Sequence, residues 1–288
     1  MSSLEPTMLS QATETSMSSP FDRLQLLADL PSRAQQAVLP FAIAEDWQVG
    51  CAYERSAKFS SKGIFANRYL LAFSRRQVPL AIAMQACQRL AMPATARSQF
   101  ARRYPTSELF YIGFEDAEDY ALYKMYLEFD RGGRSGLSHL GWKWSASDAE
   151  DEVDLDGQFR VTYYRRVGCE SLDQHIARLH QWSPVGDSPS RAFAGTVLEA
   201  SRDQASQLVC THVREASGRS SYDWNVYAAE LSVGTFASSL AKLVASYSLD
   251  SAWLHRFLAV ASTARLGHVA GGVDSMGQDF CTLYYATD

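Results

Sequence analysis

The sequence has no apolar stretch that approaches the roughly 20 residues needed to cross a bilayer. Its first twenty residues are rich in Ser and Thr, and they have neither the basic start nor the apolar run of an export signal. We therefore expect a disordered leader over residues 1–19, a single globular domain over 20–288, no membrane partner and a cytoplasmic location.

Cysteine pairs and a basic excess are also missing. The five cysteines lie far apart, are odd in number and show no C-x-x-C spacing, so neither a disulfide framework nor a zinc site is indicated. The formal net charge of -5 argues against a nucleic-acid partner, because affinity for phosphate backbones depends on clustered Lys and Arg. A few local cations would still suffice to hold a small anionic ligand.

Several common catalytic motifs are absent as well. The six histidines show no H-E-x-x-H spacing, and no G-x-S-x-G segment indicates a hydrolase. The glycine-rich stretch 132–136 lacks the lysine of a phosphate-binding loop, and 267–272 is not followed by a helical segment, as a dinucleotide fingerprint requires. We interpret neither glycine-rich stretch as a nucleotide-binding loop.

The chain does contain a recurring unit of helical segments followed by a hairpin. Helix-forming spacing marks residues 20–42, 79–103 (broken at Pro93), 171–182, 189–204 and 235–263. Five pairs of extended segments alternate with them: 47–53 and 64–73 around a polar turn at 55–63, 109–115 and 121–129, 139–145 and 159–167, 207–214 and 223–231, and 266–273 and 280–286. Because about ten antiparallel strands tend to curl and close, the pattern predicts an α+β fold, a closed antiparallel β-barrel of about ten strands surrounded by helices.

Alternation along the predicted strands separates an apolar face from a polar one. In 121–129, Tyr123 and Met125 oppose Lys124 and Tyr126. An antiparallel sheet with one solvated face would show the same alternation. The polar faces, however, repeatedly combine a cation with tyrosines, which suits an anion beside a cation or a π-system. This content favours polar faces that line the interior of the barrel.

The first predicted hairpin carries charged residues in a defined order. Glu54 is followed by Lys58 and then by Arg68, within YERSAKFSSKGIFANRYLLAF. This string resembles the opening hairpin of the cyanobactin peptide prenyltransferases, which belong to the αββα-barrel (ABBA) aromatic prenyltransferases. The resemblance continues in element order over residues 45–286, through ALYKMYLEF, GLSHLGWKW, FRVTYYRRV, SQLVCTHV, WNVYAAEL, LGHVAGG and CTLYY.

The resemblance implies an enzyme that moves a prenyl group from an allylic diphosphate to a side chain, aromatic by expectation, of a ribosomal peptide. Departure of the diphosphate requires fixed cations, for which Lys58, Arg68 and Lys124 are the candidates. Glu54 would take the proton from the attacking phenol, indole or imidazole. Taken singly, each of these residues would be an ordinary surface charge or a member of a salt bridge.

Tyrosines on the polar faces are expected to shield the allylic cation, because their rings attract positive charge without acting as carboxylate nucleophiles. Tyr126 is assigned to the prenyl pocket, and Tyr164, Tyr227 and Tyr284 to the diphosphate side of the same chamber. Tyrosines are also frequent in ordinary strands, so the alternative for each is simple packing.

Cys210 bears on the length of the donor. It stands where dimethylallyl-using members of the resembled family tend to have a bulky aromatic, and a smaller side chain would leave a deeper pocket. We therefore expect geranyl diphosphate to be favoured over dimethylallyl diphosphate. One departure is that Thr282 stands where the family often has a basic residue, which puts diphosphate contacts in the last strand in doubt.

The resemblance also implies Mg²⁺ as a cofactor that bridges the diphosphate. The sequence has no D-D-x-x-D helix of the kind that terpene synthases use, and we assign no residue as a metal ligand. Asp148, Asp151 and Asp154 are expected to form a solvated acidic loop.

Two rival functions remain open at this point. An enzyme of the same architecture could act on free tryptophan, tyrosine or another small aromatic. A noncatalytic barrel could bind a hydrophobic or anionic ligand, with Glu54 and the cations forming a buried network. Release of pyrophosphate from an allylic diphosphate separates the second rival from both enzymes.

Overall fold

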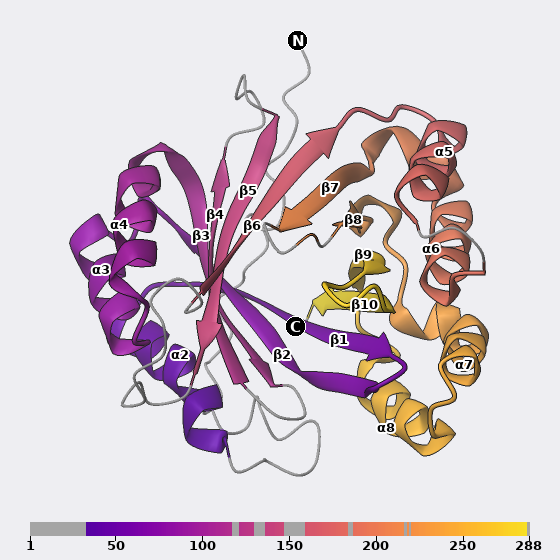
Figure 1. The fold of residues 1–288 in the computed structure, drawn as a ribbon, viewed down its shortest axis with the longest axis horizontal. Coiled ribbons are helices and arrows are strands. Elements are labelled where there is room, and N and C mark those ends of the chain that lie inside the picture. The colour runs from indigo at the N-terminus through magenta and orange to yellow at the C-terminus, as the bar shows by residue number, and fades with distance from the viewer. Residues whose placement is uncertain are drawn as a thin grey trace.

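The computed structural model describes residues 33–116, 121–129, 136–146, 159–183, 187–215, 218 and 220–286. These residues form a β-barrel wrapped by helices (Figure 1). The expected leader, the expected domain limit at residue 20 and the acidic loop with Asp148, Asp151 and Asp154 lie outside the described residues.

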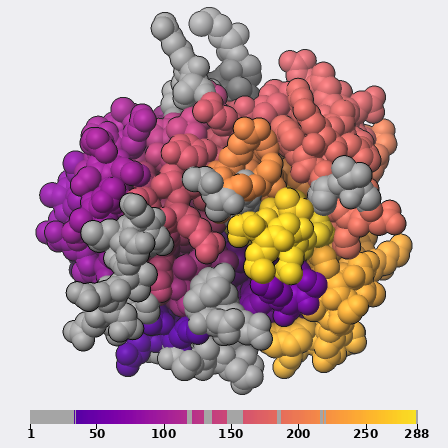
Figure 2. All heavy atoms as spheres, viewed as in Figure 1, coloured from indigo at the N-terminus to yellow at the C-terminus, as the bar shows by residue number. Residues whose placement is uncertain are grey.

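Ten antiparallel strands pair in a closed ring, in the order β1-β10-β9-β8-β7-β6-β5-β4-β3-β2. Their bounds are β1 Ala52–Ser60, β2 Gly63–Ser74, β3 Ser107–Asp116, β4 Ala121–Phe129, β5 Leu137–Ser145, β6 Phe159–Val167, β7 Val209–Glu215, β8 Ser220–Asn225, β9 Leu266–Val273 and β10 Asp279–Ala286. The ring closes where β1 pairs with β10, with Glu54 opposite Ala286. In Figure 2 the yellow end of the chain lies beside the indigo first hairpin. The predicted fold class is confirmed.

Helices cover the outside of the barrel in two groups, with α2, α3 and α4 on one side and α5, α6, α7 and α8 on the other (Figure 1). Ser171, Ser188 and Asp250 cap α5, α6 and α8 by accepting hydrogen bonds from the first backbone N–H groups. The helix bounds are α2 Ala34–Trp47, α3 Leu80–Arg89, α4 Ala94–Arg103, α5 Leu172–Trp182, α6 Pro189–Ala200, α7 Ala237–Ser246 and α8 Ser251–Ala261, and the short 3₁₀ helices are η2 Tyr104–Thr106, η3 Arg202–Gln207, η4 Tyr227–Ala229 and η5 Val233–Phe236.

The outward faces of the strands pack against these helices in two hydrophobic cores. Large buried side chains of the first core, under α2 to α4, are Phe73, Phe100, Phe110 and Trp142. Those of the second, under α5 to α8, are Phe59, Phe193, Trp224 and Phe257. Burial of each phenylalanine contributes roughly 1.5–3 kcal/mol relative to an exposed one, so the helices stabilise the barrel from outside.

The predicted faces of the strands are confirmed in β4. Tyr123 and Met125 belong to the core under α2 to α4, and Lys124 and Tyr126 lie on the opposite face. Lys124 is only 5% exposed and forms an ion pair with Glu115 of β3. A solvated sheet face would leave such a lysine in water, so the polar faces line the barrel interior.

The first strand begins later than the sequence pattern predicts. Trp47 ends α2 and packs on Phe73 and Phe110, so the predicted strand 47–53 is mostly helix and a connecting segment. The predicted polar turn 55–63 belongs largely to β1, and residues 61–62 form the turn. The segment was mistaken for a loop because its polar side chains face a polar interior rather than solvent.

The eighth strand was also misplaced. It spans Ser220–Asn225 rather than 223–231, and the chain then enters η4, so Tyr227 lies just beyond the end of the strand. Among the helices in the described part of the chain, none combines the length and the apolar character that a membrane crossing takes.

Candidate active site

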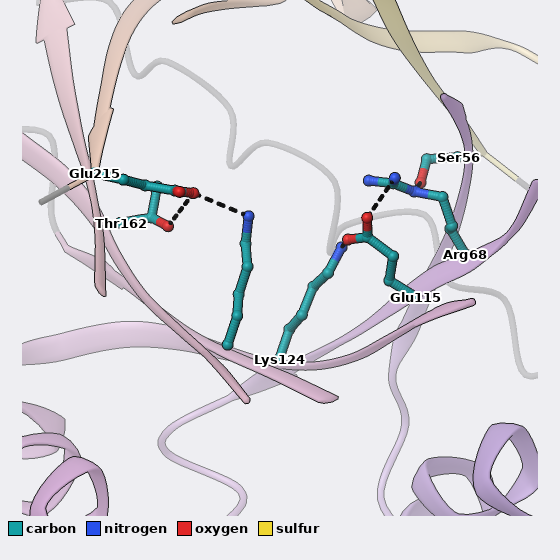
Figure 3. Close-up of polar contacts among 7 residues, drawn as sticks. Ser56, Arg68, Glu115, Lys124, Thr162 and Glu215 are labelled. Atoms are coloured by element: carbon teal, nitrogen blue, oxygen red, sulfur yellow. Dashed lines mark hydrogen bonds and ion pairs between the residues drawn. The ribbon is translucent and has the colours of Figure 1, made fainter. Parts of the chain in front are cut away.

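Basic side chains gather in the lumen near the links within the hairpins. Arg68 of β2 donates from Nη1 to Glu115 Oε1 at 2.7 Å and from Nε to Ser56 Oγ at 3.3 Å. Lys124 of β4 forms an ion pair with the other oxygen of Glu115 (Figure 3). Arg68 and Lys124 are each 5% exposed, so both charges are held in a largely enclosed space.

A second pair extends this basic region across β5 and β7. Lys143, which lies opposite Lys124 in the β4–β5 register, donates to Glu215 Oε1 at 3.2 Å. Thr162 donates to the same oxygen at 3.0 Å (Figure 3). We call Lys58, Arg68, Lys124 and Lys143, with Glu115 and Glu215, the cation cluster.

Lys58 completes the cation cluster from β1. Its Nζ lies 5.1 Å from the centroid of the Phe280 ring, and its charge contributes to a lowered pKa of Glu115. Burial acts to raise the pKa of Glu115, but Arg68 and Lys124 overcome it and hold the pKa well below the ordinary range. The cluster therefore carries four basic side chains against two carboxylates, and it is suited to a polyanion.

The pKa of Lys124 shows what this crowding does to a single cation. Burial lowers it, Glu115 opposes the change, and Arg68 and Lys143 lower it further, to about 7. A bound anion would reverse that effect, because it would favour the charged ammonium.

Glu54 stands apart from the cation cluster. It lies near the start of β1, and its Oε1 accepts a hydrogen bond of 2.7 Å from the Tyr227 hydroxyl of η4. Because η4 follows the end of β8, this contact lies at the end of the barrel opposite the hairpin links. Burial raises the pKa of Glu54, and the charge of His268 and the Tyr227 hydrogen bond oppose that rise in part.

A glycine makes room for the Tyr227 ring. A Cβ atom at Gly267 would lie 2.2 Å from Tyr227 Cζ and 2.4 Å from its hydroxyl oxygen. The ring therefore crosses β9 at a position where no side chain is possible, and it reaches Glu54 from there.

His268 and Asp223 extend the group around Glu54. His268 Nδ1 lies 2.8 Å from Asp223 Oδ1. Burial acts to lower the pKa of His268, but the charge and hydrogen bond of Asp223 outweigh it and bring the pKa to about 9. We call Glu54, Tyr227, Asp223 and His268 the Glu54 cluster.

A further carboxylate, Glu128 of β4, lies on the same side of the lumen. It accepts a hydrogen bond from the Tyr111 hydroxyl and lies 3.5 Å from His139 Nε2. Burial, followed by the charge of Glu128, raises the pKa of Tyr111, so its hydroxyl stays protonated as a donor.

Tyrosines lie on the lumen face between the two clusters. The rings of Tyr126 and Tyr164 meet edge to face at 5.9 Å, and Tyr284 contacts His268 at 5.7 Å. A Cβ atom at Gly141 would lie 2.4 Å from Tyr126 Cε1, so this glycine lets the Tyr126 ring lie against the wall. Aromatic rings therefore lie on the lumen wall between the cation cluster and the Glu54 cluster.

The structure thus brings all but one of the predicted site residues into one lumen, although Tyr227 lies beside Glu54 rather than on the predicted diphosphate side. Cys210 is the exception, because β7 directs it outward into the core under α5 to α8. It lies there with Cys169 and His175, while its strand neighbours Thr211 and Val213 have the lumen parity shared with Glu215. The prenyl-pocket role of Cys210, which the family resemblance implied, is therefore wrong, because the side chain faces the helices and not the lumen.

Cys169, Cys210 and His175 also place three potential metal-binding atoms within 4.8 Å of one another. His175 Nδ1 accepts from the Trp224 indole at 2.9 Å, and Nε2 lies 2.9 Å from the Ala205 carbonyl oxygen. Because an indole N–H only donates, Nε2 carries the proton, and both ring nitrogens are committed to the fold.

Magnesium, implied by the resemblance, does not fit a protein-held site at the cation cluster. Glu115 is paired with Arg68 and Lys124, and Glu215 accepts from Lys143 and Thr162. Both oxygens of Glu115 and Oε1 of Glu215 are thus already engaged by protein donors, and we derive no step through a metal ion.

Sequence reasoning missed several polar residues of the lumen. Lys143 and His268 stand on the polar faces of segments that were already noted, so strand alternation could have identified them. Glu115 and Glu215 lie at or next to strand ends, and their partners come from other strands. That pairing is set by the closed register, which a single sequence does not contain.

No protein-family model matches this chain, and no curated protein matches it. Several solved structures do match it. The 5-dimethylallyl tryptophan synthase from Streptomyces coelicolor, solved in complex with DMASPP and Trp, matches with a TM-score of 0.58 and 13% identity over 94% of this chain and 93% of that one.

Two further solved structures agree. PriB, solved as a binary complex with product diphosphate, has a TM-score of 0.53 and 15% identity over 82% of this chain and 79% of that one. The 6-dimethylallyltryptophan synthase from Micromonospora olivasterospora, in complex with DMASPP and Trp, has a TM-score of 0.51 and 15% identity over 82% and 81%. At this level of identity the likeness establishes the fold, and the chain has the helix-wrapped antiparallel barrel of the ABBA prenyltransferases.

Proposed function

We propose that this protein transfers a prenyl group from an allylic diphosphate to an aromatic side chain. One observation carries the proposal: a single lumen has a cluster of enclosed cations at one end and a buried carboxylate at the other, with tyrosines between them. The fold, which is that of known prenyltransferases, supports the same conclusion.

The cation cluster would bind the diphosphate and stabilise it as the leaving group. When the allylic C–O bond breaks, the electron pair stays on the diphosphate oxygen, so negative charge grows next to Lys58, Arg68 and Lys124. Fixed charges in a water-poor site stabilise that growth without reorganising solvent. Glu115 keeps the cations in place before the donor arrives.

The tyrosines would protect the allylic cation until it is captured. Tyr126, Tyr164 and Tyr284 present rings whose negative faces attract positive charge, and none of them carries a carboxylate that would trap the cation. Burial, followed by the charge of Tyr164, raises the pKa of Tyr126, so this phenol stays neutral at ordinary pH.

Glu54 would complete the reaction as the general base. A new bond forms between the allylic carbon and the acceptor atom, and the proton lost by the acceptor passes to the Glu54 carboxylate. Tyr227 donates to Oε1, which orients the carboxylate.

Different observations bear on the identity of the acceptor and on that of the donor. The resemblance of the first hairpin supports an aromatic side chain of a ribosomal, cyanobactin-like peptide. Free tryptophan is the second candidate, supported by two similar structures that were solved with Trp. The expected preference for geranyl rested on Cys210, which faces the helices, so we carry it forward only as a comparison to be measured.

Purified protein would be incubated with dimethylallyl or geranyl diphosphate, each with tryptophan or with a peptide that contains tryptophan and tyrosine. Mass spectrometry and pyrophosphate release report the transfer, with EDTA added in parallel to test for magnesium. We expect product from one acceptor class, formed about 10²- to 10⁴-fold more slowly by Glu54→Gln, while Glu199→Gln on the surface of α6 keeps wild-type activity. Binding of the diphosphates without turnover of any pair would leave the noncatalytic barrel as the function.

A further inference from the structure

His268 is a lumen residue for which prenyl transfer, as proposed above, has no use. Its strand, β9, pairs with β8, and His268 lies opposite Asn225 while Asp223 lies opposite Ala270. His268 and Asp223 are therefore diagonal neighbours on the lumen face, and Nδ1 lies 2.8 Å from Asp223 Oδ1. With Nδ1 tied to β8, the Nε2 edge of the ring points away from Asp223.

Two tyrosines fix the plane of the His268 ring. Tyr227 and Tyr284 each meet it edge to face, with ring centroids 5.7 Å away. Tyr227 is the same residue that donates to Glu54 at 2.7 Å, so His268 and Glu54 share a neighbour. The ring is thus held by one hydrogen bond and two aromatic contacts beside the carboxylate.

Several titratable groups from different elements surround Glu54. Those that act on its charge are His268 of β9, Tyr227 of η4, Asp223 of β8 and His139 of β5. Asp223 disfavours the ionised carboxylate, and the other three favour it, with His268 the strongest of them. Asp223 acts in the opposite sense on His268, whose protonated form it stabilises.

We propose that His268 is a positioning residue: Asp223 holds it as an imidazolium, and the fixed positive charge keeps the buried Glu54 carboxylate ionised and ready for the acceptor proton. The inference rests on the proposed function, because it assigns Glu54 the role of base. It also gives a role to the hydrogen-bonded His268–Asp223 pair.

The proton balance of the step is simple. The acceptor loses one proton as its bond to the prenyl carbon forms, and Glu54 gains that proton. Glu54 then releases it to solvent after product leaves. The proton on His268 does not move, and no oxidant or reductant takes part.

The first test is the pH dependence of turnover in His268→Gln. Loss of an opposite charge beside a buried carboxylate raises the carboxylate pKa. Activity, which needs ionised Glu54, should therefore fall at a higher pH than in the wild type. We expect about a ten-fold loss of kcat/KM on the acidic side and less than about a two-fold loss near pH 9.

The matched control is His180→Gln on the exposed face of α5, which should leave the profile unchanged. A loss of activity in His268→Gln that is equal at every pH would show a packing role only, and it would overturn the inference.

The second test needs no substrate and separates the two proposals. NMR of ligand-free protein labelled at the histidine ring nitrogens and the glutamate carboxyl carbons would follow both groups. His268 should titrate near pH 9, and the Glu54 titration should move upward in His268→Gln. An unmoved Glu54 titration contradicts the inference even if the enzyme is active. A moved titration in a protein without transferase activity contradicts the proposed function alone.

Discussion

Two glutamates in the same lumen are buried to the same degree and yet differ in how they hold a proton. Glu54 is 8% exposed and Glu115 is 9% exposed. Burial raises the pKa of Glu54, and its polar neighbours only partly oppose the rise. At Glu115 burial acts in the same way, but the cations paired with it bring the pKa well below the ordinary value. Neighbouring charges, not depth, decide which carboxylate can serve as a base.

The two glutamates therefore have different roles in the proposed reaction. Glu115 is the counter-ion of Arg68 and Lys124 and holds both side chains in position. In the proposed reaction the donor diphosphate then binds to these cations. Glu54 has a neutral hydrogen-bond donor, Tyr227, and is left to exchange a proton. Substitutions at the two ends should therefore produce different kinetic defects.

The largest effect is expected from Glu54→Gln. The amide cannot take a proton, so kcat should fall by about 10²- to 10⁴-fold, while the dissociation constant of the donor diphosphate changes little. Single-turnover kinetics and calorimetric titration of the diphosphate measure the two quantities. An equal loss in donor binding would mean that Glu54 belongs to the diphosphate site and would break the comparison.

Arg68→Gln should give the reverse pattern. Its hydrogen bonds to an anion are each worth about 1.5–3 kcal/mol, so the donor should bind about ten- to a hundred-fold more weakly. Glu115 would keep its pairing with Lys124, which preserves part of the cluster. Unchanged donor affinity, measured by titration with a non-hydrolysable diphosphate analogue, would place the diphosphate elsewhere.

Gly267→Ala tests how the Glu54 end is built. The added methyl group would overlap the Tyr227 ring, so we expect a destabilisation of about 1–3 kcal/mol and loss of the Tyr227 to Glu54 hydrogen bond. Gly168→Ala, where a Cβ meets nothing within 4 Å, is the matched control and should stay within about 0.5 kcal/mol of wild type. Urea unfolding of both variants is the measurement, and equal stabilities would contradict the packing argument.

The smallest effect is a proton taken up when the diphosphate binds. With its pKa near 7, Lys124 is largely neutral at pH 8 in the free protein, and a bound anion restores its charge. Up to about one proton should enter, as linkage requires, and calorimetry in buffers of different ionisation enthalpy counts it. Lys124→Met should lower the count, and the diphosphate's own protonation cancels between the two proteins. Identical counts would mean that Lys124 is already charged.

Much of the barrel could be predicted because strand alternation is a local property. The faces of β4 follow from residues 121–129 alone, and so does the inward direction of Lys124. Glu54, Lys58 and Arg68 lie in one hairpin and could be recognised together. Once the sheet is inferred to close, it follows that these three side chains share one enclosed space.

The errors had two sources: polar side chains that face the interior of the barrel were taken to face solvent, and one residue was assigned from the family resemblance alone. Ser56 and Lys58 made β1 resemble a loop, although both face the lumen. Cys210 was assigned to the pocket from the family resemblance, whereas the alternation of β7 puts Thr211 and Glu215 in the lumen and directs Cys210 outward. The pairing of Lys143 with Glu215 joins β5 to β7 across β6, and a single sequence does not contain the register that sets it.

The barrel can close only when β10, the last strand of the chain, pairs with β1. A nascent chain leaves the ribosome with β1 long before β10, so one edge of β1 has no strand partner until translation reaches Ala286. Glu54 lies on β1 and therefore on this unpaired edge. A chain cut short before β10 would keep two unprotected sheet edges prone to aggregation, and its chamber would stay open to water, so a reactive intermediate could not survive there.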